Sequence, residues 1–499
     1  MDERVYRDDD RVLRDRQKPN KKLQTIGRVV SIIQAAASVI LIVLLKRANL
    51  LPSKMMITGI IVLIALFLLT RFMMGAGRKK GRFIAGVVIA ALIVVGTLGA
   101  GSYVSKVTNT IKEITTVDYE SSYVGVYVLK DDPAESIQDA KGYSFGIMKN
   151  HGTEETQNAI AQINEELGSQ ITTTSYNGVR ETADQLLTGH CKAVIMPDAF
   201  VEMLADSEDY ADFDEQIRQI ASYEIKTEIE TSDVDVENPQ GIFTMYISGI
   251  DTFGGISTKS RSDVNILATV NTYTGQVLLV STPRDYYVPL SISGGDKDKL
   301  THAGIYGINV SKETMEMLYD TDIDYYFRIN FTGFEELIDA LGGIDVYSEY
   351  PFDVEPSFHY VEGVNHLSGI EALAFARERH AFSEGDRQRG ENQMAVITAV
   401  INKMQSSAVL NDFNGLMNGL EGSFETDMPY SVMTNMVKNQ ISSGTKWNTV
   451  SYSVDGTGTK ATTWSMNQQL YVMEPDQATI DKAKELMEAV KNGETVTVE

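Results

Sequence analysis

The stretch DVNILATVNTYTGQVLLVSTPRD, residues 263–285, decides the fold of the second half of the chain. It contains two candidate strands, DVNILATVN (263–271) and GQVLLVSTP (275–283), and the second is apolar almost throughout. Such a run is typical of a central strand that is buried on both faces. Arg284 follows at once, and a charge at the end of a buried strand is costly unless it is paired. Arg284 is therefore a candidate functional residue, with Asp285 as the alternative, purely structural partner.

Three further candidate strands surround this stretch: FTMYISGID (243–251), YYFRINF (325–331) and GGIDVYSEY (342–350). The helices between them have recognisable ends. Thr332 with Glu335 and Ser368 with Glu371 have capping-box spacing, and Gly342 stands where a C′ glycine ends a helix. A last amphipathic helix, ATIDKAKELMEAVK, spans 478–491. The pattern predicts a three-layer α/β/α domain over residues 241–499.

The N-terminal part contains three long apolar runs, at 29–45, 55–69 and 83–104. The third is long enough to cross a bilayer, and the first two reach that length with their flanks. We expect three transmembrane helices over 29–104, preceded by a basic tail, 1–28; the alternative is a set of buried helices in a soluble domain. Nine basic residues precede the first run and five flank the turn between the second and third. The positive-inside rule then places the N-terminus in the cytoplasm and everything after residue 105 outside the cell.

Charge is divided unequally along the chain. Residues 1–106 contain 18 Lys and Arg residues and 6 Asp and Glu residues, whereas the whole chain contains 44 and 68. An acidic exterior argues against nucleic acid as a partner and makes any local arginine cluster there more informative. The single cysteine, Cys191, excludes an intramolecular disulfide.

Residues 105–240 are expected to form a stalk, 105–118, and an accessory α/β domain. Candidate strands lie at 122–129, 143–150 and 191–197, with helical patterns at 153–168 and 178–190 between them. This alternation predicts a parallel sheet. The charged stretch 226–241 marks the boundary to the next domain. Because no catalytic constellation appears in these residues, we interpret the accessory domain as a spacer or a recognition domain.

Two aspartates are candidate metal ligands. Asp251 follows the strand YISGI and Asp263 precedes VNILATV, so both are expected at strand ends on one rim of a sheet, where α/β domains bind ligands. Magnesium takes one or two carboxylates together with phosphate oxygens. The alternative is that either aspartate caps a turn.

Basic side chains gather in the segment 377–393. Arg377 and Arg379 are two residues apart, so in an extended segment both point to one face, where they repel each other unless an anion lies between them. Nearby carboxylates, Glu371, Glu378 and Glu384, are the alternative partners. Asp386 is a candidate N-cap of the following helix, with Arg389 and Gln393 one turn apart on its face. The apolar residues that continue this stripe, Val396, Ile397, Val400 and Ile401, fit either core packing or a prenyl chain.

Together, the segments YISGIDTFGG, KSRSDVNILATV, LLVSTPRDYYVP and ALAFARERHAFSEGDRQRGENQ resemble the LytR-CpsA-Psr family, most closely over about 241–445. Three spans followed by an insert resemble its capsule-type branch. The resemblance implies Mg²⁺ (or Mn²⁺) on Asp251 and Asp263. It implies substrate binding by Arg284, Lys299, Arg377, Arg379, Arg389 and Gln393, although Lys297 is easily confused with Lys299. The chain departs from the family at Thr252, Phe253 and Asn392, where many members have arginine nearby.

The activity implied by the resemblance is an extracellular phosphotransferase of the cell membrane. Such enzymes move a capsule, teichoic-type or other glycopolymer from a polyprenyl-pyrophosphate carrier to a peptidoglycan sugar hydroxyl, with Arg377, Arg389 and Asp386 as the catalytic residues. Asp386 either deprotonates the acceptor or orients Arg389. Two alternatives remain: a non-catalytic protein that binds, assembles or regulates the lipid-linked glycan, and a hydrolase of the same pyrophosphate, which is also a conceivable side activity.

Overall fold

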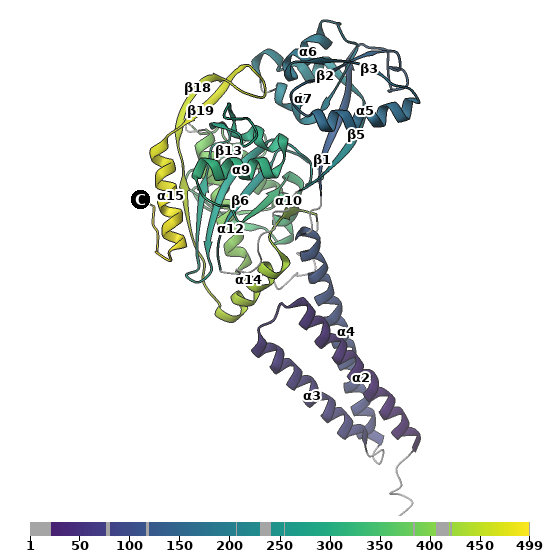
Figure 1. Cartoon of the computed structure of the whole chain (residues 1–499). Helices are drawn as coiled ribbons and strands as arrows, with labels where there is room; N and C mark the ends of the chain where they lie inside the picture. Colours follow the sequence, from purple (N-terminus) through teal and green to yellow (C-terminus); the bar gives the residue numbers. More distant parts are fainter. Residues whose placement is uncertain are drawn as a thin grey trace, which may run out of the picture. The chain divides into compact units, whose positions relative to one another are not determined.

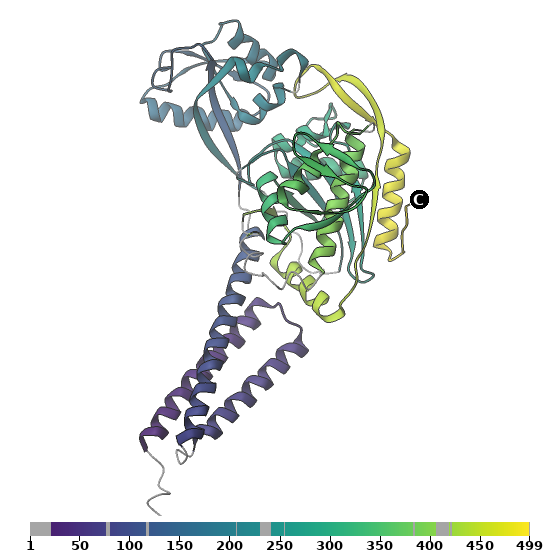
Figure 2. The same cartoon turned by 180° about the vertical axis from the view of Figure 1, so that it is seen from behind.

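The structure, a computed structural model, describes residues 21–75, 80–115, 119–205, 207–229, 241–253, 255–382, 385–405, 419 and 422–498. Most of the expected basic tail and most of the charged stretch 226–241 lie outside these residues. The chain divides into two compact units (Figures 1 and 2): residues 1–112 with 429–445, and residues 113–428 with 446–499.

The first unit contains three helices long and apolar enough to cross a membrane: α2 (Lys21–Ala48), α3 (Ser53–Gly75) and α4 (Lys80–Thr115). α2 and α3 pack closely, and Thr70 donates a buried hydrogen bond of 2.7 Å to the side-chain oxygen of Gln34. α4 continues to Thr115, so the expected stalk is helical as far as that residue. A short helix, α14 (Tyr430–Ser443), belongs to the same unit.

The accessory domain begins the second unit. It has a sheet of order β3-β2-β4-β1-β5, built from β1 (Tyr119–Leu129), β2 (Ser144–Met148), β3 (Thr172–Tyr176), β4 (Ala193–Pro197) and β5 (Ile217–Glu228). Its helices are α5 (Thr153–Leu167), α6 (Gly178–Leu187), α7 (Asp198–Ala205) and α8 (Phe213–Gln216). The strands β2 and β4 are parallel, as expected, and β3, a strand that the sequence analysis did not predict, is parallel to β2. The expectation is wrong for β1, which pairs antiparallel with both β4 and β5. The sequence did not predict β5, because few of its residues are buried and its hydrophobic pattern is weak.

The larger domain is built on a six-stranded sheet of order β16-β11-β6-β7-β8-β17. The strands are β6 (Ile242–Ile250), β7 (Ser262–Asn271), β8 (Gln276–Ser281), β11 (Tyr325–Ile329), β16 (Phe424–Thr426) and β17 (Asn448–Ser453). β8 is buried along its whole length, as its apolar sequence predicts. β11 runs parallel to β6 and β17 parallel to β8, whereas the other neighbours are antiparallel.

Helices cover both faces of this sheet. On one face, α9 (Ile308–Tyr319) and α15 (Gln477–Lys491) share a core with Leu278 and Val280 of β8. On the other face, α12 (Asp386–Met404) packs against β8 and β17, with Gly390 close to Ser281. Adjacent strand residues point to opposite faces, so α15 and α12 lie on opposite sides. The expected three-layer α/β/α domain is therefore confirmed.

Two further α-helices of the larger domain, within its described residues, are α10 (Phe331–Ala340) and α11 (Gly369–Arg377). Ser368 and Glu371 form the expected capping box, and Gly342, with φ +71°, ends α10 as expected. The expected capping box of Thr332 is wrong. Asn330 is the N-cap of α10 and accepts a hydrogen bond of 2.8 Å from the Gly333 amide, which places Thr332 inside the first turn.

Four two-stranded sheets complete the domain: β9 (Tyr287–Pro289) with β10 (Lys297–Lys299), β12 (Ile344–Ser348) with β15 (Gly363–Leu367), β13 (Phe352–Val354) with β14 (Phe358–Tyr360), and β18 (Gly456–Thr462) with β19 (Gln469–Pro475). The strand expected at 342–350 is thus confirmed, but it lies outside the main sheet.

The hairpin β18–β19 joins the two domains of the second unit (yellow in Figures 1 and 2). Met466 and Leu470, near its tip, belong to the same core cluster as Phe200 and Leu204 of the accessory domain. Trp464 meets the His151 ring edge-on, with ring centroids 4.8 Å apart. The hairpin therefore supplies part of the accessory domain's core.

Candidate active site

A β-bulge aims the first acidic residue of the site. In the ladder between β6 and β7, Gly249 pairs with Val264 and Ile250 with Ser262, which leaves Asp263 without a partner. Asp263 thus lies inside β7 rather than before it. A bulge turns the extra side chain away from the regular alternation of a strand, and bulges are common beside active sites. Asp251 follows β6 directly, so the two aspartates occupy neighbouring strand ends.

Asp263 is bound by two side chains. Arg284, just beyond β8, makes an ion pair of 2.7 Å with Oδ2, and the Thr301 hydroxyl donates a hydrogen bond of 3.0 Å to Oδ1. Asp285, the alternative partner of Arg284, is more distant at 3.9 Å and pairs more closely with Lys299, at 2.9 Å. Asp285 thus links the two cations. Lys297 instead pairs with Glu474 of the hairpin, which favours Lys299 as the basic residue of this loop.

The start of α12 contributes the second acid–base pair. Asp386 is the first residue of the helix, so the expected N-cap assignment is wrong; Gly385, with φ +51°, holds that position. The Asp386 carboxylate forms an ion pair with Arg389 one turn later. Burial raises the pKa of Asp386, and the nearby Arg389 partly opposes that rise. Burial also lowers the pKa of Arg389, and the neighbouring Arg284 lowers it further, although Asp386 opposes both effects.

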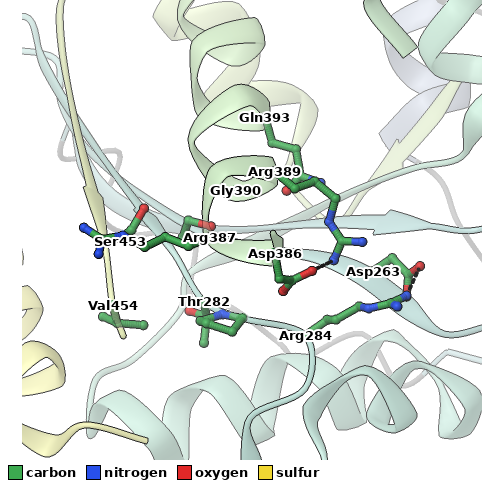
Figure 3. Close-up of a pocket in the computed structure, with 12 residues that line it drawn as sticks. Asp263, Thr282, Arg284, Asp386, Arg387, Arg389, Gly390, Gln393, Ser453 and Val454 are labelled. Carbon is green, nitrogen blue, oxygen red and sulfur yellow. Dashed lines mark hydrogen bonds and ion pairs between the residues drawn. The ribbon is translucent and has the colours of Figure 1, made fainter. Parts of the chain in front are cut away.

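These side chains surround one pocket (Figure 3), in which Arg284 and Arg389 extend into the same space. Five of the residues expected from the sequence line it: Asp263, Arg284, Asp386, Arg389 and Gln393. Gln393 also donates a hydrogen bond of 3.3 Å to the carbonyl of Ala376 in α11. The sequence reasoning missed other lining residues: Ser281, Thr282, Pro283, Gly390, Ser453 and Val454. Arg387 lines the pocket as well.

Arg377 and Arg379 lie apart from this pocket. Arg377 is the last residue of α11, so the expected extended segment is wrong at that position; the extended backbone begins at Glu378. The Arg377 guanidinium is 4.0 Å from Asp251 and stacks over the Phe331 ring at 4.2 Å. Arg379 contacts His380. Of the alternative carboxylate partners, Glu371 is held in the capping box and Glu378 accepts from the Ala381 amide, while Glu384 lies outside the described residues.

The two departures from the family pattern have structural roles. Phe253 is largely exposed and packs edge-on against Phe331, with centroids 5.1 Å apart. Asn392 is buried and donates a hydrogen bond of 3.3 Å to the Phe375 carbonyl, which fastens α12 to α11. At these two positions, where many family members have arginine, this chain therefore has an aromatic contact (Phe253) and a contact between two helices (Asn392).

The donor set suits a hard, oxygen-binding cation. Asp251 and Asp263 supply only carboxylate oxygens, and Asp251 contacts Arg261 and Arg377 only loosely, at 3.5 and 4.0 Å. In the part of the chain that the structure describes, no cluster of three or more His, Cys, Asp or Glu side chains forms a ready-made metal cage. Two carboxylates fit magnesium when phosphate oxygens and water complete its coordination.

The loop between the two aspartates is held by the accessory domain. The Ser121 amide in β1 donates to the Ser257 carbonyl, and the Lys259 amide donates to the Ser121 carbonyl, both at 2.8 Å. The Lys259 ammonium forms a largely buried ion pair of 3.0 Å with Glu155 of α5. Residues of the accessory domain therefore hold this loop both by backbone hydrogen bonds and by a side-chain ion pair.

A buried charge cluster lies beside the same loop. Arg328 of β11 is fully buried and forms ion pairs with Glu120 of β1 and Glu425 of β16. Ser257 donates a hydrogen bond of 3.1 Å to Glu425. Burial raises the pKa of Glu425 to about 7, although Arg328 opposes the rise.

The sequence is similar to those of one family of known proteins. The model of the LytR_cpsA_psr family matches residues 210–489. The polyisoprenyl-teichoic acid–peptidoglycan teichoic acid transferase TagU of Bacillus cereus is 32% identical over 210 residues, which cover 42% of this chain and 67% of that protein. TagU of Bacillus subtilis is 30% identical over 255 residues, 51% of this chain and 80% of that protein. The crystal structure of B. subtilis TagV aligns with a TM-score of 0.43 at 27% identity, over 52% of this chain and 99% of that one.

Proposed function

The chain belongs to the LytR-CpsA-Psr family, and we propose that it is a membrane-anchored phosphotransferase that moves a glycopolymer from a polyprenyl-pyrophosphate carrier to a sugar hydroxyl of peptidoglycan. Relatives named as teichoic acid transferases support the reaction class. The observation that carries the proposal is the pair Arg284 and Arg389. Two guanidinium groups extend into one pocket, close enough for Arg284 to depress the pKa of Arg389.

A pyrophosphate explains that arrangement. Like charges in a partly buried site repel, and an anion between them relieves the repulsion. Guanidinium groups match phosphate oxygens in planar, bidentate contacts. Each arginine also forms an ion pair with one carboxylate, Asp263 or Asp386, which holds the guanidinium group in place before the substrate binds. Such prior placement of charge is how enzymes stabilise a transition state at little reorganisation cost.

In the proposed reaction, the acceptor hydroxyl oxygen attacks the phosphorus next to the glycan. A new phosphorus–oxygen bond forms, the bridging bond of the pyrophosphate breaks, and polyprenyl phosphate leaves with the bonding electrons. Arg284 and Arg389 balance the charge that develops on the leaving phosphate. Catalysis of this kind is mostly positioning and electrostatic stabilisation.

Asp386 is the proposed acceptor of the hydroxyl proton. It lines the pocket beside both arginines, and burial raises the pKa of its carboxyl. A raised pKa brings a base closer to neutral pH, where it takes up a proton more effectively in the transition state. Its ion pair with Arg389 also orients the guanidinium, so a single side chain serves both roles considered from the sequence.

We further propose that Asp251 and Asp263 hold a magnesium or manganese ion. When bound, this ion would supply positive charge to the pyrophosphate oxygens. Arg261 and Arg377 beside Asp251, and Thr301 beside Asp263, would keep the two carboxylates oriented toward it.

The orientation in the membrane is proposed from charge. Arg71, Lys80 and Arg82 flank the turn between α3 and α4, at the same end of the helices as Lys21, Lys22 and Arg28 at the start of α2. The positive-inside rule puts that end in the cytoplasm and the end of α4 outside. The accessory and larger domains would then face the cell wall, where the acceptor is found.

The test is transfer by the purified full chain in vesicles, with polyprenyl-pyrophosphate-linked glycan and with peptidoglycan either present or omitted. We expect glycan joined to peptidoglycan through a phosphodiester, together with polyprenyl phosphate, only when the acceptor is present. Equal release of polyprenyl phosphate without peptidoglycan would identify a hydrolase. Tight binding of the lipid with no turnover in either condition would identify a binding or assembly protein.

A further inference from the structure

α14 is a short amphipathic helix in the same compact unit as the membrane spans, although it lies more than 300 residues beyond them in the sequence. The Tyr430 hydroxyl donates a hydrogen bond of 2.8 Å to the carbonyl of Ala48, the last residue of α2. Lys438, two turns later, donates to the side chain of the next residue, Asn49. α14 is therefore fastened to the turn between α2 and α3.

That turn must lie at a membrane surface. Only residues 49–52 separate α2 from α3, and both helices have the length and hydropathy of spans. The 23 residues of α3 extend about 34 Å at 1.5 Å per residue, only slightly more than the roughly 30 Å hydrocarbon core. The first residue of α3 is consequently within a few ångströms of the edge of that core, and so is any group hydrogen-bonded to the turn.

The side chains of α14 are distributed as expected for a helix at a membrane surface. Tyr430, Thr434 and Lys438 recur every four residues and form the stripe that meets the turn, with Thr434 buried. Met433, Val437 and Ile441 have the same spacing and form the adjacent stripe. Val437 and Ile441 are 39% and 41% exposed, so this stripe presents two neighbouring branched apolar side chains at the surface. Asn439 and Ser442 are exposed on another side.

We propose that α14 is an interfacial helix, which lies in the headgroup layer of the bilayer with Met433, Val437 and Ile441 turned into the lipid. Amphipathic helices bind membranes in this manner, with the apolar face at the boundary of the acyl chains. Tyr430 fits the preference of tyrosine for the same layer, and Lys438 suits anionic headgroups. The occupant of the apolar stripe is thus lipid. This inference does not depend on the reaction proposed above.

The experiment measures the depth of single positions on α14. Cys191 is the only cysteine and is buried, so a Cys191→Ala background permits one new thiol at a time. Val437→Cys and Ile441→Cys report on the apolar stripe, and Asn439→Cys, on another side of the same helix, is the matched control. Each full-length protein is labelled with an environment-sensitive fluorophore. It is then placed in vesicles of phosphatidylcholine and phosphatidylglycerol, with or without brominated acyl chains.

We expect the labels at 437 and 441 to emit at shorter wavelength than the label at 439 and to lose intensity in brominated lipid. Aqueous iodide should quench the label at 439 more strongly. Equal spectra and equal quenching at 437 and 439 would overturn the proposal. Shielding of 437 from iodide without loss in brominated lipid would also overturn it, because a protein surface would then cover the stripe. Ile441→Cys gives an independent reading if Val437→Cys does not reconstitute.

Discussion

Replacing Arg389 with alanine tests the proposed site most directly. The side chain is 10% exposed, lies beside Arg284 and forms an ion pair with Asp386. Loss of one preorganised donor to a developing oxyanion typically lowers turnover by about 10²–10³-fold, roughly 3–4 kcal/mol. We expect a loss of that size in single-turnover transfer at saturating lipid-linked glycan, where weaker ground-state binding no longer affects the rate. Arg389→Lys should recover only part of the rate, because an ammonium group cannot make the bidentate contact.

The same substitution should also change stability, and the two effects can be separated. Without Arg389, the partly buried Asp386 carboxylate has lost its ion-pair partner, which costs up to about 3–5 kcal/mol for a fully buried pair. The raised pKa of Asp386 would rise further, so the native state would hold a proton that the unfolded chain releases. The stability loss should therefore be greatest at neutral pH and diminish as the pH falls through that raised pKa. Urea unfolding at two pH values measures it.

Two comparisons make the result decisive. Arg387→Ala removes another pocket-lining arginine from the same helix. Because the ion-pair partners of Arg387, Glu391 and Asp455, are partly exposed, we expect only a several-fold loss of rate. The double variant Asp386→Asn/Arg389→Ala should transfer glycan more slowly than either single variant if each group acts on the substrate. A near-normal rate for Arg389→Ala at saturation would refute the catalytic role. A double variant no slower than Asp386→Asn would reduce Arg389 to a positioning residue.

Four further outcomes are expected. Asp263→Asn should abolish the dependence of transfer on added magnesium, and because it removes the ion-pair partner of Arg284 it should also lower the urea midpoint; an unchanged magnesium titration would contradict the metal assignment. Arg377→Ala should slow single-turnover transfer only about tenfold, because its side chain is 54% exposed and 4.0 Å from its acidic neighbour; a 10³-fold loss would show that it reaches the substrate. Glu155→Gln should slow transfer by about tenfold by loosening the loop, and exchange of the charges of Glu155 and Lys259 should restore most of the rate; no recovery would assign the loss to a different cause. Glu425→Gln removes a carboxyl whose native pKa is raised to about 7, so wild type should lose stability relative to this variant between about pH 4.5 and 7, by up to about 3–4 kcal/mol, and then remain level; parallel pH profiles in urea unfolding would exclude the raised pKa.

The sequence predicted the parts of the site that local patterns determine. The apolar strand β8 and the charge that follows it placed Arg284 correctly at a sheet end, and helical spacing placed Arg389 and Gln393 on one face of α12. The errors occur where a single residue decides between two local geometries. Arg377 is helical because α11 continues through that residue, and Asn330 caps α10 before Thr332 can do so.

Long-range pairing was beyond the reach of local patterns. Ser453 and Val454 line the pocket because β17 pairs with β8, a strand about 170 residues earlier, and nothing in the sequence around Ser453 indicates that neighbour. The bulge at Asp263 is likewise a property of two strands together. The ion pair between Glu155 and Lys259 joins two domains, and nothing in their sequences predicts this contact.

The hairpin β18–β19 has a consequence for biosynthesis. Residues 119–228 are made well before residues 456–475, yet Met466 and Leu470 fill part of the accessory domain's core. When the five strands of that domain have been synthesised, the part of its core that Met466 and Leu470 fill is still exposed, because these residues are made later. Omission of buried groups of this size costs about 2–5 kcal/mol each, a large part of a small domain's stability. We therefore expect the accessory domain to complete its folding late, and a fragment that ends at residue 228 would expose the surface that the hairpin covers.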